Sequence, residues 1–283
     1  MLPVLIHYKR RRSDYTGARR KNGPWRAVFT AARRKQITAG SFRAVDERAA
    51  GAPGREHTMY PGIHNFSEIG KLNKVLLHRP GEELESLTPG TLERLLFDDI
   101  PYLKVAQEEH DRFAEVLREN GVEVVYYVDE VAKAIADPVR QIQLVNDFLN
   151  ISKIHAKGLR ASMTSLLLDM PPKQMVTKLI AGIKRCEVAT KQPTSLMDLV
   201  DDDYPFVSDP MPNLYFTRDP GACVGEGINI HRMHTPARKR ESLLLKYMFL
   251  YDRDFAAPDN KMWYDLSDSY SIEGGDVLVL SKD

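Results

Sequence analysis

The order of the first extended and helical segments is the feature that most restricts the fold of this chain. Residues 74–78 form a short apolar run that is closed by the turn-forming residues 79–81, which predicts a buried strand. Residues 105–120 place apolar side chains on one helical face, and Gly121 follows where a left-handed cap is needed. Residues 123–128 are rich in Val and Tyr, which predicts a second strand. A strand, a helix and a strand in this order indicate an α/β fold.

The next segment has a different pattern, with helical periodicity and almost no strand signal. Residues 139–149 carry Ile142, Val145 and Leu149 at helical spacing, and residues 172–185 carry a similar stripe behind a proline that suits a first helical turn. Residues 195–200 are a further candidate helix. The sequence therefore predicts an α/β body made of residues 59–129 and 205–283, interrupted by an all-helical insertion of residues 130–204.

Three more elements are predicted in the last part of the chain. Residues 228–230 form a candidate strand, and residues 242–251 are apolar enough for a buried helix. Residues 277–280 follow a tight glycine turn and predict another buried strand. The sequence ends three residues later, so we expect the chain to be a fragment of a longer protein whose other segments cover this strand.

Charge is divided unevenly along the chain. Residues 1–58 contain 14 Lys and Arg against 4 Asp and Glu, whereas residues 59–283 contain 26 against 35. A basic arm suggests an anionic partner, and an acidic body suits a soluble enzyme with a cationic substrate. Residues 1–58 are compatible with an organelle transit peptide, with a disordered arm that binds nucleic acid, or with upstream sequence before a true start at Met59. The change of charge close to Met59 favours the last interpretation.

The cysteine and histidine content excludes several kinds of site. Cys186 and Cys223 are the only cysteines, which fits a reducing, cytoplasmic location. No apolar run approaches the roughly 20 residues of a membrane span. His231 and His234 without a third ligand are weak signs of a metal, so no metal is expected. Cys223 with these histidines could form a nucleophile pair, but a small buried residue is the simpler interpretation.

Two motifs combine acidic side chains with features that suit a binding site. The first is Phe216-Thr217-Arg218-Asp219, in which an aromatic residue precedes an Arg–Asp pair. The second is Glu273-Gly274-Gly275-Asp276, in which two acids flank glycines that allow a ligand to approach the backbone. Each motif alone is also compatible with an ordinary turn.

Taken together, the motifs resemble those of arginine deiminases. The matching residues are Asn213, Phe216, Asp219, Arg238, Glu273 to Asp276, His78 to Gly81, Leu96 to Pro101, Glu109 and His110. The resemblance runs from about Met59 to the end and includes the helical insertion, which the related amidinotransferases do not share. It implies a five-bladed α/β propeller (the pentein fold), of which this chain would supply about two blades.

The resemblance also implies a reaction, the hydrolysis of L-arginine to L-citrulline and ammonia without a metal or organic cofactor. A guanidinium is a planar cation with several N–H donors in a fixed fork, so carboxylates must hold it while a thiolate attacks its carbon and a proton donor serves the leaving ammonia. By the resemblance, Asp219 grips the guanidinium and Glu273 is the second catalytic acid. The implied substrate-binding residues are Asn213, Phe216, Arg238 and Asp276, with Arg238 pairing with the α-carboxylate.

The catalytic set implied by the resemblance is incomplete in residues 1–283. The family's nucleophilic cysteine lies near the C-terminus, and its general acid/base histidine lies in a motif several dozen residues after the glutamate. We therefore expect a fragment that is inactive alone. The alternatives are an inactive arginine-binding or subunit-association remnant and an amidinotransferase. A homo-oligomer is expected for the full-length family, with no membrane partner and no nucleic acid unless residues 1–58 bind it.

Overall fold

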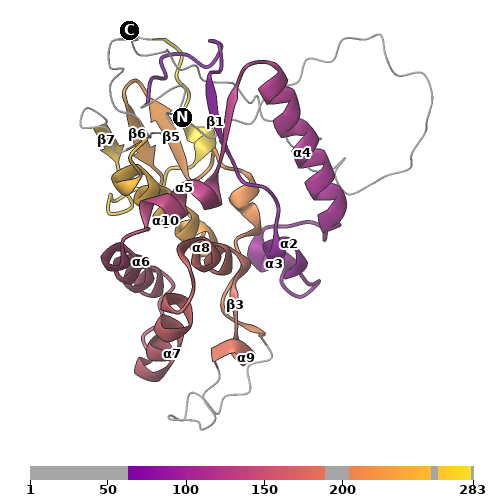
Figure 1. Ribbon diagram of the computed structural model, residues 1–283, viewed down its shortest axis with the longest axis vertical. Coiled ribbons are helices and arrows are strands. Elements are labelled where there is room, and N and C mark those ends of the chain that lie inside the picture. Colours follow the sequence, from indigo (N-terminus) through magenta and orange to yellow (C-terminus); the bar gives the residue numbers. More distant parts are fainter. Residues whose placement is uncertain (1–62, 189–203, 256–260, 282–283) are drawn as a thin grey trace, which may run out of the picture.

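The computed structural model describes residues 63–188, 204–255 and 261–281 (Figure 1). These residues form a mixed α/β structure in which helices accompany three separate sheets of two, two and three strands, and no closed sheet occurs among them. The predictions for residues 1–58 and for a helix at residues 195–200 lie outside the described ranges. None of the helices in these ranges has both the length and the apolar character that a membrane crossing requires.

The predicted strand–helix–strand unit is confirmed. Strand β1 (Lys74–Leu77) is completely buried and pairs in parallel with β2 (Glu123–Tyr126). Helix α4 (Leu103–Glu119) connects the two strands, and Gly121 has the positive φ of 76° that a left-handed helix cap requires. Two short helices, α2 (Glu82–Glu85) and α3 (Leu92–Leu95), precede α4.

The predicted second strand is too long, because Tyr127 already begins helix α5 (Tyr127–Ala134). The Tyr127 ring is fully buried, and its hydroxyl donates a hydrogen bond of 2.7 Å to the carbonyl of Glu241. Burial raises the pKa of Tyr127 well above its ordinary value, so this hydroxyl stays a donor. The tertiary contact of Tyr127 therefore outweighs the local preference of the segment for extended structure.

The region predicted as an all-helical insertion is mainly helical. Its helices, beginning with α5, are α6 (Pro138–Ile151), α7 (Lys157–Leu168), α8 (Pro172–Ala181) and α9 (Arg185–Val188). Only part of the predicted stripe on α6 is buried, since Val145 and Leu149 are inaccessible but Ile142 is 47% exposed. The boundaries at residues 130 and 204 stay a prediction.

The predicted helix at residues 172–185 is wrong at its end. Helix α8 stops at Ala181, Gly182 has a φ of 86°, and Ile183–Lys184 form β3, which pairs antiparallel with β4 (Phe206–Ser208). A side chain at Gly182 would lie 2.8 Å from the backbone nitrogen of Pro210, so the close approach of that distant segment fixes the turn.

The last part of the chain contains the three-stranded sheet. Strand β5 (Gly221–Val224) is antiparallel to β6 (Gly227–Ile230), which is parallel to β7 (Lys261–Tyr264). Strand β6 and helix α10 (Lys239–Tyr251) confirm the predicted strand at residues 228–230 and the predicted buried helix.

The predicted strand at residues 277–280 is wrong. Residues Gly274–Asp276 form a short 3-10 helix, η5, and the chain then continues without strand pairing. Within the described ranges, Val279 accepts one backbone hydrogen bond from Glu68, but its own N–H binds the Glu68 carboxylate at 3.0 Å. Leu278 and Leu280 are 57% and 82% exposed. An apolar run without a neighbouring strand cannot form a ladder.

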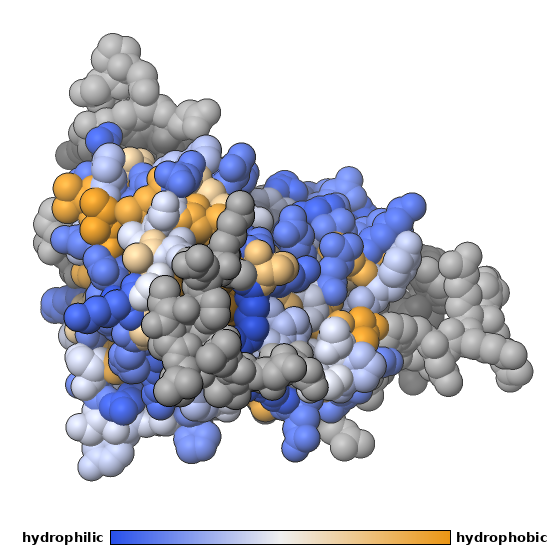
Figure 2. Space-filling model, turned by 90° about the horizontal axis from the view of Figure 1, so that it is seen from below, coloured by the Kyte–Doolittle hydropathy of each residue, from blue (hydrophilic) through white to orange (hydrophobic). Residues whose placement is uncertain are grey.

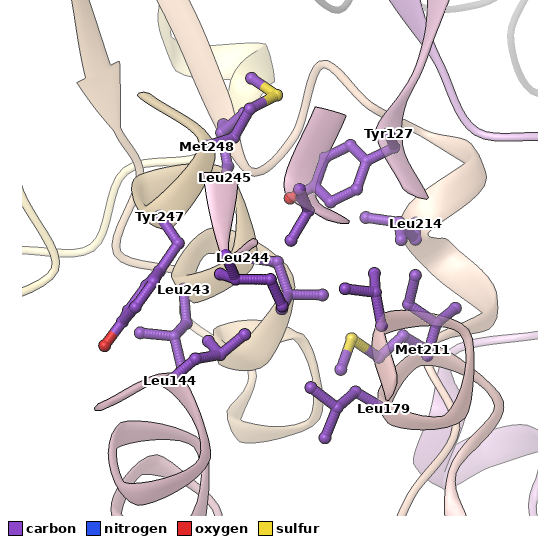
Figure 3. Close-up of a cluster of buried hydrophobic side chains, with 14 of the residues drawn as sticks. Tyr127, Leu144, Leu179, Met211, Leu214, Leu243, Leu244, Leu245, Tyr247 and Met248 are labelled. Carbon is purple, nitrogen blue, oxygen red and sulfur yellow. The ribbon is translucent and has the colours of Figure 1, made fainter. Parts of the chain in front are cut away.

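The main core joins α10 to the helices that surround it. Figure 3 shows Tyr127 of α5, Leu144 of α6, Leu179 of α8 and Leu244 of α10 in one cluster of buried side chains, and each of the four is fully buried. Burial of such a side chain contributes about 1.5–3 kcal/mol. The buried side chains fix the position of α10, and Arg238, a residue of the candidate site, lies directly before this helix.

The face seen in Figure 2 is mostly hydrophilic, with an apolar area on one side.

Candidate functional site

The candidate site contains a carboxylate that is held by a buried arginine. Asp219 lies in the turn between the 3-10 helix η3 (Pro212–Tyr215) and β5. Arg238 ends the 3-10 helix η4 (Pro236–Arg238), directly before α10. Its Nη1 lies 2.8 Å from Oδ2 of Asp219, and the side chains of Arg238 and Asp219 are 8% and 27% exposed. The carboxylate is therefore fixed from the protein side while part of it stays accessible.

The other nitrogens of Arg238 are bound within the fold. Nε lies 3.1 Å from both carboxylate oxygens of Glu241, and Nη2 lies 2.8 Å from Glu241 Oε2 and 3.2 Å from the carbonyl oxygen of Asn213. Burial alone would lower the pKa of Arg238, but the charges and hydrogen bonds of Glu241 and Asp219 outweigh it and raise this pKa. Arg238 is thus a permanent cation in a fixed orientation.

Asn213 and Phe216, the predicted pocket residues, belong to the segment that carries Asp219. The buried amide of Asn213 donates a hydrogen bond of 2.6 Å to the carbonyl of Leu95. The Phe216 ring is partly buried, and the carbonyl of Phe216 accepts the backbone N–H of Asp219 at 3.0 Å. Thr217 anchors this turn to β1 through a hydrogen bond of 3.0 Å to the carbonyl of Leu76.

Glu273 and Asp276 cap each other around η5. The Asp276 carboxylate accepts the backbone N–H of Glu273 at 2.9 Å, and the two residues form a capping box. Oε1 of Glu273 accepts the backbone N–H of His234 at 3.1 Å. This places the Glu273 carboxylate beside the segment of residues 231–234.

Two connections join the Glu273 segment to the Asp219 segment. Arg218 donates hydrogen bonds of 3.4 Å to the carbonyl of Gly274 and 2.7 Å to that of Val277. A side chain at Gly274 would lie 2.4 Å from the carbonyl oxygen of Arg218, so the two backbones are in close contact. The second connection is the loop from His231, whose Nδ1 lies 2.8 Å from the carbonyl of Asp219. Within the described ranges, no contact joins the carboxylates of Asp219 and Glu273 directly.

The sequence did not indicate two charged partners of this site, Glu68 and Glu241. Arg218 binds Glu68 at 2.9 Å, and Arg238 binds both Glu241 and Asp219. The adjacent residues Arg218 and Asp219 therefore pair with other residues and not with each other. The spacing of Arg238 and Glu241 by three residues is a signal that could have been used. Glu68 lies 150 residues from Arg218 along the chain and gives no such local signal.

Neither cysteine has the environment of a catalytic nucleophile within this site. Cys223 lies in β5 and is 1% exposed, and burial raises the pKa of its thiol to about 12. A thiolate is the reactive form, so this environment disfavours nucleophilic chemistry at Cys223. Cys186 is exposed on α9, the short helix of the insertion region.

A separate acidic group lies between α5 and the end of α10. One carboxylate oxygen from each of Glu130, Asp252 and Asp254 lies within 4.8 Å of the others, a spacing that could hold a metal ion. Lys133 binds Glu130 at 3.0 Å. Burial, and then the neighbouring carboxylates, raise the pKa of Asp252 to about 6. No pattern in the sequence indicated this group.

Replacing Asp252 by Asn is expected to stabilise the protein above pH 6. Between about pH 4 and pH 6 the folded state retains a proton that the unfolded state releases, so the parent chain loses stability as the pH rises through this range. Asn carries no charge and still accepts the N–H of Asp254, which now lies 2.8 Å from Asp252 Oδ1. We expect a gain of about 1–2 kcal/mol at pH 7.5 and none near pH 4, measured by urea unfolding at both pH values.

The control for this change is Asp169→Asn, at an exposed position. It is expected to leave the free energy of unfolding nearly unchanged at both pH values. Equal stabilisation by Asp252→Asn at pH 4 and pH 7.5 would contradict the assignment of the effect to ionisation.

Comparison with known proteins gives one consistent result. A family model described as arginine deiminase matches residues 93–283. An arginine deiminase from Staphylococcus haemolyticus is 49% identical over 217 residues, which are 77% of this chain and 53% of that protein. Arginine deiminases from Clostridium perfringens and Bacillus cytotoxicus are 48% and 45% identical, over 77% and 78% of this chain and 53% and 54% of those proteins. The chain thus spans about half the length of the curated relatives it matches.

Proposed function

Because the chain belongs to the arginine deiminase family, we propose that it carries the part of an arginine deiminase active site that holds the guanidinium group. The complete reaction replaces one guanidinium nitrogen of L-arginine by the oxygen of water, releasing ammonia and leaving L-citrulline. In this proposal, Asp219 accepts N–H groups of the guanidinium, and Glu273 binds next to the reacting carbon and assists proton transfer.

The arrangement of Asp219 is the observation that carries this proposal. Arg238 holds its Oδ2 at 2.8 Å, while the side chain remains 27% exposed. A carboxylate that is oriented by a buried cation and still reaches solvent is suited to bind a second, mobile guanidinium. Because Asp219 is already oriented, little conformational entropy is lost when a ligand binds it.

The remaining predicted residues take supporting roles in the proposed site. Arg238 orients Asp219 and offers the α-carboxylate of arginine its remaining Nη1 donor, since Nε and Nη2 already bind Glu241 and Asn213. Phe216 forms an apolar wall. Asp276 acts mainly by capping the backbone of Glu273, which keeps that carboxylate in place.

The nucleophile in this proposal is neither cysteine of the chain. Cys223 is buried with a raised thiol pKa, and Cys186 lies outside the site. The resemblance assigns the nucleophilic cysteine and the general acid/base histidine to family segments that follow the glutamate motif. The chemistry requires no metal or organic cofactor, because thiolate attack and carboxylate binding suffice.

The larger architecture is also a proposal. Residues 59–129 and 205–283 form about two blades of a five-bladed propeller, and residues 130–204 form a helical insertion. The helical character of α6, α7 and α8 supports this division. The full-length protein is a cytoplasmic homo-oligomer in this proposal.

The proposal is tested by titrating the 283-residue chain with L-arginine in an isothermal titration calorimeter. We expect saturable binding that weakens by roughly tenfold or more in Asp219→Asn, because a charge-assisted hydrogen bond contributes about 1.5–3 kcal/mol. L-Citrulline is expected to bind more weakly than L-arginine, since it lacks the positive charge. An ammonia assay is expected to stay at background, because neither cysteine is suited to attack the substrate.

The matched control is Asp169→Asn, which removes an exposed carboxylate of α7's C-terminal end. This variant is expected to bind L-arginine like the unsubstituted chain. Failure of the unsubstituted chain to bind L-arginine, or equal affinity of Asp219→Asn, would refute the proposed role of this segment.

A further inference from the structure

His231 is a buried histidine beside the candidate site. It directly follows β6 and is completely inaccessible to solvent. Its backbone N–H binds the carbonyl of Pro220 at 3.0 Å, and its side-chain Nδ1 lies 2.8 Å from the carbonyl oxygen of Asp219. One residue therefore binds two successive carbonyl groups of the turn that carries Asp219.

These contacts define the protonation of the ring. A carbonyl oxygen can only accept a hydrogen bond, so Nδ1 must carry a proton. Burial lowers the pKa of His231, an effect that outweighs the opposite influence of Asp219, and the ring is therefore neutral near pH 7. A neutral imidazole with its proton on Nδ1 has an unprotonated Nε2. This Nε2 is buried and has no hydrogen-bond partner in the described ranges.

Such an arrangement stabilises the fold less than a fully bonded histidine, because a buried acceptor without a hydrogen-bond partner loses its hydration without compensation. The hydrogen bond from Nδ1 to the Asp219 carbonyl is therefore the one by which the ring stabilises this turn. Asp219 is fixed at three points, namely its carboxylate by Arg238, its N–H by Phe216 and its carbonyl by His231. The carbonyl carbon of Asp219 and the Cβ that bears its carboxylate are bonded to the same Cα, so a shift of the backbone at this Cα also moves the carboxylate.

We propose that His231 is a positioning residue for Asp219: its Nδ1–H holds the Asp219 carbonyl and thereby sets the direction in which the Asp219 carboxylate meets a guanidinium. This inference rests on the proposed function of Asp219. His231 itself does not touch the ligand. Three charged groups act on its ring. Asp219 and Asp276 favour a protonated ring, whereas the Arg218 cation disfavours it.

The first test measures the ring directly, in the unsubstituted 283-residue chain. With ¹⁵N-labelled histidine, NMR distinguishes a proton on Nδ1 from one on Nε2. We expect the Nδ1–H form for His231 at pH 7. A ring that carries its proton on Nε2 would overturn the proposal, because the Asp219 carbonyl would then have no side-chain donor.

The second test compares two amide substitutions of equal polarity. His231→Asn places an amide N–H close to the position of Nδ1, whereas His231→Gln places it close to the position of Nε2. We expect His231→Asn to keep L-arginine affinity within about threefold and His231→Gln to lose roughly tenfold or more. The NMR shift of the Asp219 carbonyl carbon should follow the same order. His155→Gln, at an exposed histidine, is the control and should change neither quantity.

The outcomes separate the two proposals. Equal L-arginine affinities and equal Asp219 carbonyl shifts in His231→Asn and His231→Gln would refute the positioning role. Absence of arginine binding in the unsubstituted chain would refute the proposed function instead. The ring protonation and the Asp219 carbonyl shift would then still decide whether His231 positions Asp219.

Discussion

Replacing Arg238 by Met is expected to lower the free energy of unfolding by about 3–5 kcal/mol, the usual cost of removing one partner of a buried ion pair. Arg238 and Glu241 have side-chain exposures of 8% and 1%, so the substitution leaves the Glu241 carboxylate buried without its cation. It also removes the hydrogen bonds to Asp219 and to the carbonyl of Asn213. The loss is measured by urea unfolding followed by circular dichroism.

A second substitution tests whether the stranded charge causes this loss. In the Arg238→Met chain, Glu241→Gln removes the buried charge and should recover part of the stability. Arg79→Met is the control, because Arg79 pairs with Asp111 at an exposed position where a salt bridge contributes about 0–1 kcal/mol. If Arg238→Met and Arg79→Met cost the same, Arg238 would not anchor the site.

The elements that the sequence predicted well are those whose burial is encoded locally. Residues 74–78 around strand β1 form a mainly apolar run, α4 carries an apolar face and is followed by Gly121, and most of α10 is apolar. These local patterns were sufficient to predict the three elements. The run at residues 277–280 is equally apolar, but a strand also needs a partner, which the described residues do not supply. At Gly182 the chain turns with a φ of 86° beside the backbone of Pro210, and this close approach of another segment cannot be read from residues 172–185.

The candidate site likewise contains residues that the sequence predicted and partners that it did not. The resemblance indicated Asp219, Arg238 and Glu273 individually, and the structure places Asp219 against Arg238. Glu241 could have been inferred from its spacing of three residues from Arg238, but the other partners could not be inferred from motif spacing, because they come from other segments of the chain. Glu68 reaches Arg218 across 150 residues of sequence, and His231 binds Asp219 only because β5 and β6 form a hairpin.

Replacing Gly274 by Ala is expected to displace the segment that carries Glu273. The added methyl group would lie 2.4 Å from the carbonyl oxygen of Arg218 and 2.7 Å from its Cγ, so one of the two backbones must move. Overpacking of this kind costs about 1–3 kcal/mol. Because Glu273 lies next to the displaced residue, we also expect L-arginine affinity to fall by roughly tenfold or more. Urea unfolding and calorimetric titration measure the two effects.

The neighbouring glycine provides a matched control for this prediction. A side chain at Gly275 would have no protein atom within 4 Å, so Gly275→Ala should leave the free energy of unfolding nearly unchanged. The backbone N–H of His234, which binds Glu273, reports on the displacement through its NMR shift. A shift in Gly274→Ala but not in Gly275→Ala would show that the contact with Arg218 holds Glu273 in place. Identical behaviour of the two variants would mean that this contact does not position the second acid.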